Sequence, residues 1–231
     1  MSRVLFVLGG TLAYQEAVST SPLFWMALMG VAMGPLLWVE KREYIPGKLL
    51  FKPLASTVFI LAAVASGALK TRPGQWVFAG LVFSYLGDVA LIFSHRVLFL
   101  SGLVVFLLGH VMYVAAFWQG DVDGAMAAGA VVPLVGIAMF IYRWLAPHLG
   151  RLKGPVVAYI VVISVMVASA AGLLSSAHGA WIFLGAVLFF VSDICVARDR
   201  FVTQGFLINR GLGLPLYYGG QLVLALYATR I

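Results

Sequence analysis

Charged residues are scarce in this sequence, and cysteine is almost absent. Asp, Glu, Lys and Arg make up 10% of the 231 residues, against about 25% in a typical soluble domain. Hydrophobic residues reach 63%, and mean hydropathy is +1.04. The shortage of charge excludes an ordinary soluble domain. It predicts an all-α fold, a polytopic transmembrane helical bundle that forms one integral membrane domain over residues 1–231.

The single cysteine and the small number of acidic residues exclude further classes. Cys195 alone forms no internal disulfide and no multi-cysteine metal site. Eight acidic residues against 15 Lys and Arg give a net charge of +7, which in a soluble protein would suggest a nucleic-acid partner. Here the basic residues lie in short loops between apolar runs. We therefore expect no nucleic acid and interpret the charge as a determinant of membrane orientation. No GxSxG motif supports a serine hydrolase.

The chain contains many long apolar runs. A spanning helix needs about 20 mostly apolar residues, and about eight runs qualify: 22–39, 53–70, 74–94, 98–118, 125–144, 155–174, 179–197 and 206–228. A further apolar piece, Val4 to Val18, is short and carries Gln15 and Glu16. It fits an interfacial helix, a signal-like segment or an extra span. We therefore divide the domain into an N-terminal extension, 1–21, and a core, 22–230.

The loops between these runs alternate in charge. One set contains most of the basic residues: Lys41, Arg42, Lys48, Lys52, Arg96, Arg143, Arg151, Lys153, Arg198, Arg200 and Arg210. The other set has only Lys70, Arg72 and Arg230. The positive-inside rule predicts that the first set is cytoplasmic.

Two aspartates interrupt the apolar runs. Asp88 lies in GLVFSYLGDVALIF and Asp193 in GAVLFFVSDICVA. A carboxylate inside a bilayer costs at least about 2.5 kcal/mol on insertion scales, so by default it marks a site. The other six acidic residues fall at the ends of predicted spans or in loops, where we expect water to solvate them: Glu16, Glu40, Glu43, Asp121, Asp123 and Asp199. Only Asp88 and Asp193 need a functional or specific structural reason.

The two aspartates are predicted at one depth. Each lies about 14 residues into a span that enters from outside, or about 21 Å at about 1.5 Å per residue. Both therefore fall in the cytoplasmic third of the membrane, which permits one shared site. The two spans are also four apart in order and align as Gly80 with Gly185. This fits a possible 4+4 parallel repeat, although apolar helices also produce such matches by chance.

Other polar residues in the predicted spans each have two interpretations. His110 and Tyr113 lie one turn apart on one helix face, and they either join neighbouring helices by hydrogen bonds or serve a function. Lys52 with Pro53 opens a span at the cytoplasmic face. It is either a snorkelling lysine or a cation for a lipid phosphate.

The last span carries Tyr217 and Tyr218 just after Pro215. A proline inside a span frees backbone carbonyls, and such breaks often line a cavity. The two tyrosines are therefore candidates for a binding site.

Three functional classes are compatible with buried carboxylates. His110, Asp88 and Asp193 could supply three zinc ligands for a membrane lipid hydrolase, but the other three histidines lie near loops. A proton-coupled transporter would use the carboxylates as a relay, although transporter sites lie near the midplane and these aspartates lie nearer one face. The aspartates could also join neighbouring helices in a structural or lipid-sensing protein.

Four segments of the chain resemble the YhhN family of lysoplasmalogenases. SYLGDVALIF, FLLGHVMYVAAF, GAVLFFVSDICVARDRF and LYYGGQLVLALY occur in that family's order and spacing, and the Lys52-Pro53 opening also fits. The likeness covers about residues 22 to 230. It implies an enzyme of the cell membrane, the inner membrane of a bacterium, with its active site toward the cytoplasm.

The resemblance also implies a reaction and a set of residues. The substrate would be a lysophospholipid, a lysoplasmalogen, embedded among membrane lipids. Hydrolysis of its vinyl ether bond would give a fatty aldehyde and glycerophosphoethanolamine or glycerophosphocholine, with no metal or other cofactor. The family's two membrane aspartates match Asp88 and Asp193 as catalytic residues. Its histidine and tyrosines match His110, Tyr113 and Tyr217 as substrate-binding residues, with Tyr218 also possible.

The chemistry of a vinyl ether agrees with two carboxyl groups. Hydrolysis begins with proton transfer to carbon, which gives an oxocarbenium ion that water captures, and the resulting hemiacetal collapses. This needs one protonated carboxylic acid and one carboxylate, as in glycosidases. Two close buried carboxylates resist double ionisation and would share one proton. Lys52, with Arg198 or Arg200, would bind the phosphate.

Overall fold

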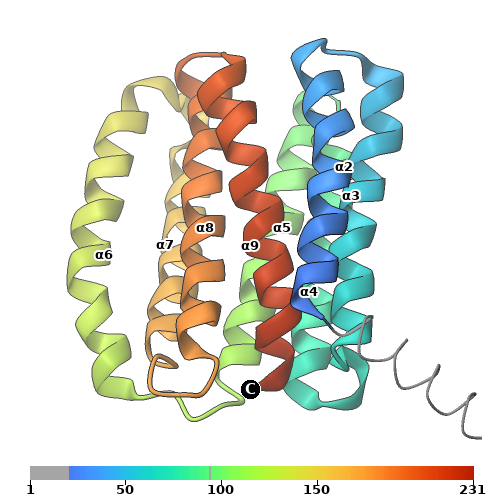
Figure 1. Ribbon diagram of the computed structural model, residues 1–231. Coiled ribbons are helices and arrows are strands. Elements are labelled where there is room, and N and C mark those ends of the chain that lie inside the picture. The colour runs from blue at the N-terminus through green and yellow to red at the C-terminus, as the bar shows by residue number, and fades with distance from the viewer. Residues whose placement is uncertain (1–20, 94) are drawn as a thin grey trace, which may run out of the picture.

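Eight α-helices account for most of residues 21–93 and 95–231, which are the residues that this computed structural model describes (Figure 1). No strand occurs among them, so the all-α prediction is confirmed. The helices are α2 (Pro22–Lys41), α3 (Ile45–Ala65), α4 (Arg72–Ala90), α5 (Arg96–Phe117), α6 (Gly124–Leu145), α7 (Lys153–Ala171), α8 (Gly179–Ala197) and α9 (Gly213–Tyr227). The N-terminal piece Val4 to Val18 lies outside the described residues.

Six of the helical stretches are long and apolar enough to cross a membrane. They are α2, α3, α5 and the stretches that contain α6, α7 and α8. The two remaining helices carry more polar groups or are shorter: α4 includes Gln75 and Asp88, and α9 has 15 residues. The protein is therefore a multi-pass membrane bundle, and a count of eight spans stays a prediction.

The predicted spans agree with the observed helices to within four residues at each end, except the second and the last. We expected a span over 53–70 that opens at Lys52, whereas α3 runs over Ile45–Ala65. Pro46 occupies the first turn, where a proline is tolerated, and Pro53 lies inside the helix. Lys52 is therefore a buried residue in the second turn of α3 and not the end of a span. Lys48 and Lys52 looked like loop residues because the carboxylates near them, Glu40 and Asp88, belong to other helices.

The last predicted span is divided into two parts. A π-helical turn, η4 (Arg198–Val202), continues α8, and a second one, η5 (Phe206–Leu212), precedes α9. Pro215 lies in the first turn of α9, where its missing N–H would have no intrahelical partner anyway. The prediction that Pro215 breaks a span was therefore wrong. The irregular stretch is residues 198–212.

The two halves of the chain repeat one pattern of neighbours. In the first half α2 packs on α3, α3 on α4 and α4 on α5; in the second half α6 packs on α7, α7 on α8 and α8 on α9. Between the halves, α3 contacts α9 and α7 contacts α5, so α9 lies between the helices of both halves in Figure 1. These pairings have the form that a 4+4 parallel repeat requires, and the repeat stays a prediction.

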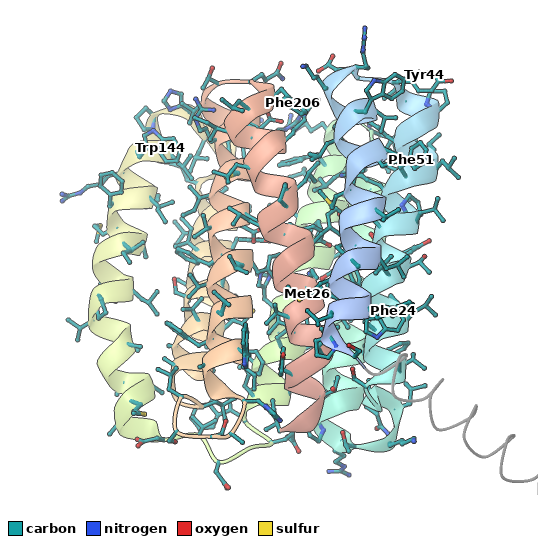
Figure 2. All side chains as sticks on the ribbon, viewed as in Figure 1. Phe24, Met26, Tyr44, Phe51, Trp144 and Phe206 are labelled. Atoms are coloured by element: carbon teal, nitrogen blue, oxygen red, sulfur yellow. The ribbon has the colours of Figure 1, made fainter. Side chains whose placement is uncertain are left out.

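The loops predicted to be cytoplasmic gather at one end of the bundle. Figure 2 shows Tyr44, Trp144 and Phe206 at this end and Phe24 toward the other. The helices alternate in direction, so the segments at residues 42–44, 91–93, 146–152 and 198–212 share this end. We call it the basic end, because most of the loop lysines and arginines lie there.

Candidate active site

A cavity of about 330 Å³ lies toward the basic end of the bundle, and Asp88 and Asp193 both line it. Asp88 is two residues from the end of α4, and Asp193 is four residues from the end of α8. Both helices run toward the basic end, so the two carboxyl groups come to similar depths. The structure therefore brings together the two residues that the sequence singled out. A volume near 300 Å³ is at the lower bound for small-molecule pockets.

Asp88 is buried and is held by hydroxyl groups from two other helices. Ser56 Oγ of α3 donates to Asp88 Oδ2 at 2.7 Å, and Tyr217 Oη of α9 donates to the same oxygen at 2.8 Å. Tyr218 Oη lies 3.4 Å from Ser56 Oγ and 3.4 Å from the backbone oxygen of Lys52. Asp88 is thus fixed from α3 and α9 at the wall of the cavity.

Asp193 has different neighbours. Tyr159 Oη of α7 donates to Asp193 Oδ2 at 2.7 Å, and His110 Nε2 of α5 lies 3.4 Å from the same oxygen. The Asp193 side chain keeps 16% of its surface exposed, whereas His110 is fully buried. No hydrogen bond joins Asp88 to Asp193 in the described part of the chain. The geometry thus gives each carboxyl group its own partners and provides no direct contact through which the pair would share one proton.

The two carboxyl groups are held in a matching way from the two halves of the chain. Asp88 of α4 is contacted from α3 and α9, and Asp193 of α8 is contacted from α7 and α5. A four-helix repeat would relate α3 to α7, α4 to α8 and α5 to α9, so each aspartate would have equivalent helices around it. The chemistry differs, because Asp88 meets serine and tyrosine hydroxyl groups and Asp193 meets a tyrosine and an imidazole.

Aromatic rings pack directly behind the carboxyl groups. Phe189 lies 4.4 Å from His110 and 5.4 Å from Tyr217 between ring centroids, and Phe106 lies 5.7 Å from Tyr217. Phe106 also lines the cavity. These rings fix the side chains that contact Asp88 and Asp193 and exclude water from that side of the site.

Lys52 is a buried cation that lines the same cavity. Among residues 21–93 and 95–231, no carboxylate lies within ion-pair distance of its amino group. Its positive charge nevertheless acts on Asp88, because Lys52 lies one turn before Ser56 on the same face of α3. A buried cation without an ion pair is a suitable ligand for a phosphate.

A cluster of charged side chains surrounds the cavity at the basic end, and we call it the charged rim. Glu40 Oε2 pairs with Lys48 Nζ at 3.2 Å and with Arg210 Nη1 at 3.6 Å, and Arg210 also pairs with Glu43 at 3.2 Å. The rim consists of Glu40, Glu43, Lys48, Asp199, Arg200 and Arg210. We expected water to solvate Glu40, and that was wrong: Glu40 is 5% exposed and lies between two cations.

An apolar wall faces the rest of the cavity. It is formed by Ile141 and Leu145 of α6 and by Val156, Ile160 and Ile163 of α7. The cavity therefore has charged side chains at its end near the loops and aliphatic side chains along one side. This arrangement matches an amphiphile, because an ionic head and a hydrocarbon chain need separate surroundings.

Three of the predicted binding residues lie behind the cavity wall. His110, Tyr113 and Tyr218 are buried and do not line the cavity. Tyr113 Oη donates to Gln221 Oε1, and Gln221 Nε2 donates to Ser84 Oγ at 2.8 Å, so this network joins α5, α9 and α4. Tyr217 and Lys52, in contrast, line the cavity.

The two arginines considered for the phosphate separate in the structure. Arg200 lines the cavity and lies over the ring of Phe99 at 4.2 Å. Arg198 does not line it, because its Nη1 donates to Asn209 Oδ1 at 2.6 Å. Of the two, Arg200 is therefore the one placed to approach a ligand.

Sequence reasoning missed Ser56 and Tyr159, which donate hydrogen bonds to the two carboxyl groups. Serine and tyrosine are common in membrane helices, so neither residue stands out by type. One signal was present for Ser56, which follows Lys52 by four residues and therefore shares its helix face. No comparable signal marks Tyr159.

The zinc alternative depends on three ligands meeting at one point. Within the described residues, no group of three or more His, Cys, Asp or Glu side chains could hold a metal ion. Asp193 and His110 are neighbours, but Asp88 is engaged by Ser56 and Tyr217. The side chains do not form the cluster that a zinc site needs.

Comparisons with known proteins identify relatives along most of the chain. The YhhN family model matches residues 47–228. A protein of Bos taurus named lysoplasmalogenase TMEM86A is 32% identical over 204 residues, which cover 84% of this chain and 83% of that protein. A Mycobacterium tuberculosis protein named lysoplasmalogenase is 31% identical over 232 residues, covering 94% of this chain and 86% of that protein. No solved structure matches.

Proposed function

The chain belongs to the YhhN family, and from this membership we propose that it is a lysoplasmalogenase. The reaction is hydrolysis of the vinyl ether bond of a lysoplasmalogen, which yields a fatty aldehyde and a glycerophospho-headgroup alcohol. The relatives named lysoplasmalogenase, which cover more than four fifths of this chain, support the proposal.

One observation carries the catalytic part of the proposal: two carboxyl groups, Asp88 and Asp193, line one cavity with a buried cation and an apolar wall. A vinyl ether reacts through an oxocarbenium ion. One carboxylic acid delivers the proton, and one carboxylate stabilises the cation and positions water, as in glycoside hydrolysis. Asp88 and Asp193 provide these two groups without a metal.

The remaining lining residues support binding of a lysolipid. The phosphate lies only a glycerol unit away from the vinyl ether, so its ligand must be close to the carboxyl groups. Lys52 satisfies this requirement, and Arg200 adds a second cation at the rim. The hydrocarbon chain lies along the aliphatic side chains of α6 and α7. Tyr217 orients Asp88 and faces the substrate.

Incubation of the purified protein with a lysoplasmalogen tests this function directly. We expect release of free fatty aldehyde in proportion to enzyme and time. The control is a lysolipid with a saturated ether bond, because that substrate has no double bond to protonate. A purified, folded protein that releases no aldehyde from the vinyl ether would contradict the proposal.

A further inference from the structure

The orientation of the His110 ring fixes which nitrogen carries hydrogen. Nδ1 lies 2.7 Å from the backbone oxygen of Phe106, and a carbonyl oxygen only accepts hydrogen bonds. Nδ1 is therefore the protonated nitrogen. In the neutral ring Nε2 then carries a lone pair, so it needs a donor.

Among the described residues, an Asp193 oxygen is the carboxylate oxygen that faces this lone pair. His110 Nε2 is buried and has no hydrogen-bond partner within residues 21–93 and 95–231, and Asp193 Oδ2 faces it at 3.4 Å. An ionised Asp193 would place a negative oxygen against a lone pair, which is repulsive. A single proton between the two atoms removes the repulsion, either as a neutral acid beside a neutral imidazole or as an ion pair.

The surroundings favour the neutral arrangement. His110 is enclosed by Phe106, Phe189 and Tyr159, and its ring lies 4.4 Å from that of Phe189. In the described part of the chain, no Lys or Arg forms an ion pair with Asp193. An imidazolium and a carboxylate would be two buried charges in an apolar interior, with no other ion-pair partner to stabilise either of them. Tyr159 Oη also donates a hydrogen bond to Asp193, and both the protonated and the ionised form of Asp193 can accept it.

Asp88 has the opposite environment. Ser56 and Tyr217 donate to its Oδ2, and the charge of Lys52 acts on it. No acceptor comparable to an imidazole lone pair faces Asp88 among the described residues. Two donors and a cation are the environment of a carboxylate.

We infer that Asp193 is the acid that protonates the substrate carbon, that His110 holds this acid in its protonated form, and that Asp88 works as the carboxylate. This division of roles rests on the proposed function. His110 is a positioning residue, because it lies behind the cavity wall and acts through Asp193.

The assigned roles give a balanced cycle. The electron pair of the double bond takes the Asp193 proton, which becomes bonded to the vinyl carbon farther from the ether oxygen. This leaves an oxocarbenium ion beside the Asp88 carboxylate. Water adds to this ion and loses a proton to Asp88, forming the hemiacetal. Asp88 then protonates the departing glycerol oxygen while Asp193 removes the hemiacetal hydroxyl proton. The carbon–oxygen bond breaks, the aldehyde forms, and both side chains return to their starting states.

Infrared spectroscopy of the purified full chain without substrate tests where the proton resides. The carbonyl stretch of a neutral carboxylic acid is separate from the carboxylate and amide bands, and it shifts in D₂O. At neutral pH we expect a D₂O-sensitive neutral-carboxyl band in the native protein. It should persist in Asp88→Asn and disappear in Asp193→Asn. Loss in Asp88→Asn, loss in both variants, or a native protein without the band would each overturn the assignment.

A His110→Phe variant keeps both aspartates and covers the case in which an Asn variant does not fold. Phenylalanine fills the ring site but accepts no hydrogen bond, so the neutral-carboxyl band should move to higher wavenumber. An unchanged band would contradict the role of His110. Because these spectra contain no substrate, they are independent of turnover. If the band belongs to Asp193 but the protein releases no aldehyde, that result contradicts the proposed function and leaves the location of the proton unchanged.

Discussion

Replacing either site aspartate by asparagine keeps the shape of the side chain and removes its acid–base chemistry. Because general acid–base catalysis contributes about 10²–10⁴-fold, Asp88→Asn and Asp193→Asn should each lower kcat by about that factor. Aldehyde release at saturating substrate measures the loss, and circular dichroism checks the helical fold. Asp121→Asn, in the exposed loop after α5, is the matched control and should retain activity. A folded site variant with near-normal kcat would refute the assigned role.

Lys52 should act mainly on binding. A phosphate contact stabilises the bound substrate and the transition state alike, so its removal raises KM more than it lowers kcat. Lys52→Met keeps most of the buried stem and removes the charge. Initial rates over a range of lysoplasmalogen concentrations separate the two constants, and Lys70→Met at the exposed opposite end is the control. A fall in kcat with unchanged KM would instead place Lys52 in the chemical step.

At the scale of secondary-structure elements, glycines let the site helices approach closely. A Cβ at Gly80 of α4 would lie 2.6 Å from the Tyr113 ring of α5, and one at Gly87 would lie 2.6 Å from Phe106. In the other half, a Cβ at Gly220 of α9 would lie 2.9 Å from the backbone oxygen of Gly185 in α8. Small residues at such crossings are typical of membrane helix pairs. The close pairs α4–α5 and α8–α9 carry both aspartates.

Two adjacent glycines in α9 provide a matched test of this packing. Gly220→Ala inserts a methyl group against the backbone of α8, and overpacking of this kind typically costs about 1–3 kcal/mol. Gly219 has no heavy atom within 4 Å of its Cβ position. Gly219→Ala should therefore be neutral, or stabilising by up to about 1 kcal/mol through helix propensity. Thermal unfolding in one detergent measures both variants. Equal Tm values for the two variants would contradict the close α8–α9 contact.

At the scale of the whole molecule, the charge distribution predicts orientation. The basic end should face the cytoplasm, so the cavity that holds Asp88 and Asp193 opens toward that side. In a Cys195→Ser background, Tyr44→Cys and Gln119→Cys place single exposed thiols at opposite ends without changing the charge. A membrane-impermeant maleimide added to intact cells should label the cysteine at position 119 and leave the one at position 44 unmodified until the membrane is opened. The reverse pattern would invert the topology.

Activity of the whole protein should survive chelation. Asp88, Asp193 and water suffice for acid-catalysed addition to a vinyl ether, and the described residues contain no cluster of metal ligands. Aldehyde release after treatment with EDTA, and with a stronger zinc chelator, should equal that of untreated enzyme. Loss of activity that added metal restores would make Asp88, Asp193 and His110 ligands instead of acid–base groups.

Several features followed from the sequence alone. Apolar runs long enough to span a bilayer determined the helical class and placed most helix boundaries within a turn. Two carboxylates in otherwise apolar runs identified Asp88 and Asp193, since burial of a charge is too costly to occur without a reason. The order of four short motifs around them was sufficient to recognise the family.

Only the tertiary structure decided which groups meet. Lys52 and Lys48 looked like loop residues because their carboxylate neighbours, Asp88 and Glu40, belong to other helices. Ser56 and Tyr159 became functional candidates only through contacts across 32 and 34 residues of sequence. The different partners of the two aspartates also arise from packing: one meets hydroxyl groups and a cation, the other an imidazole lone pair. Hydropathy and residue spacing describe one helix at a time, whereas the protonation state of a buried carboxyl group depends on the side chains that neighbouring helices bring to it.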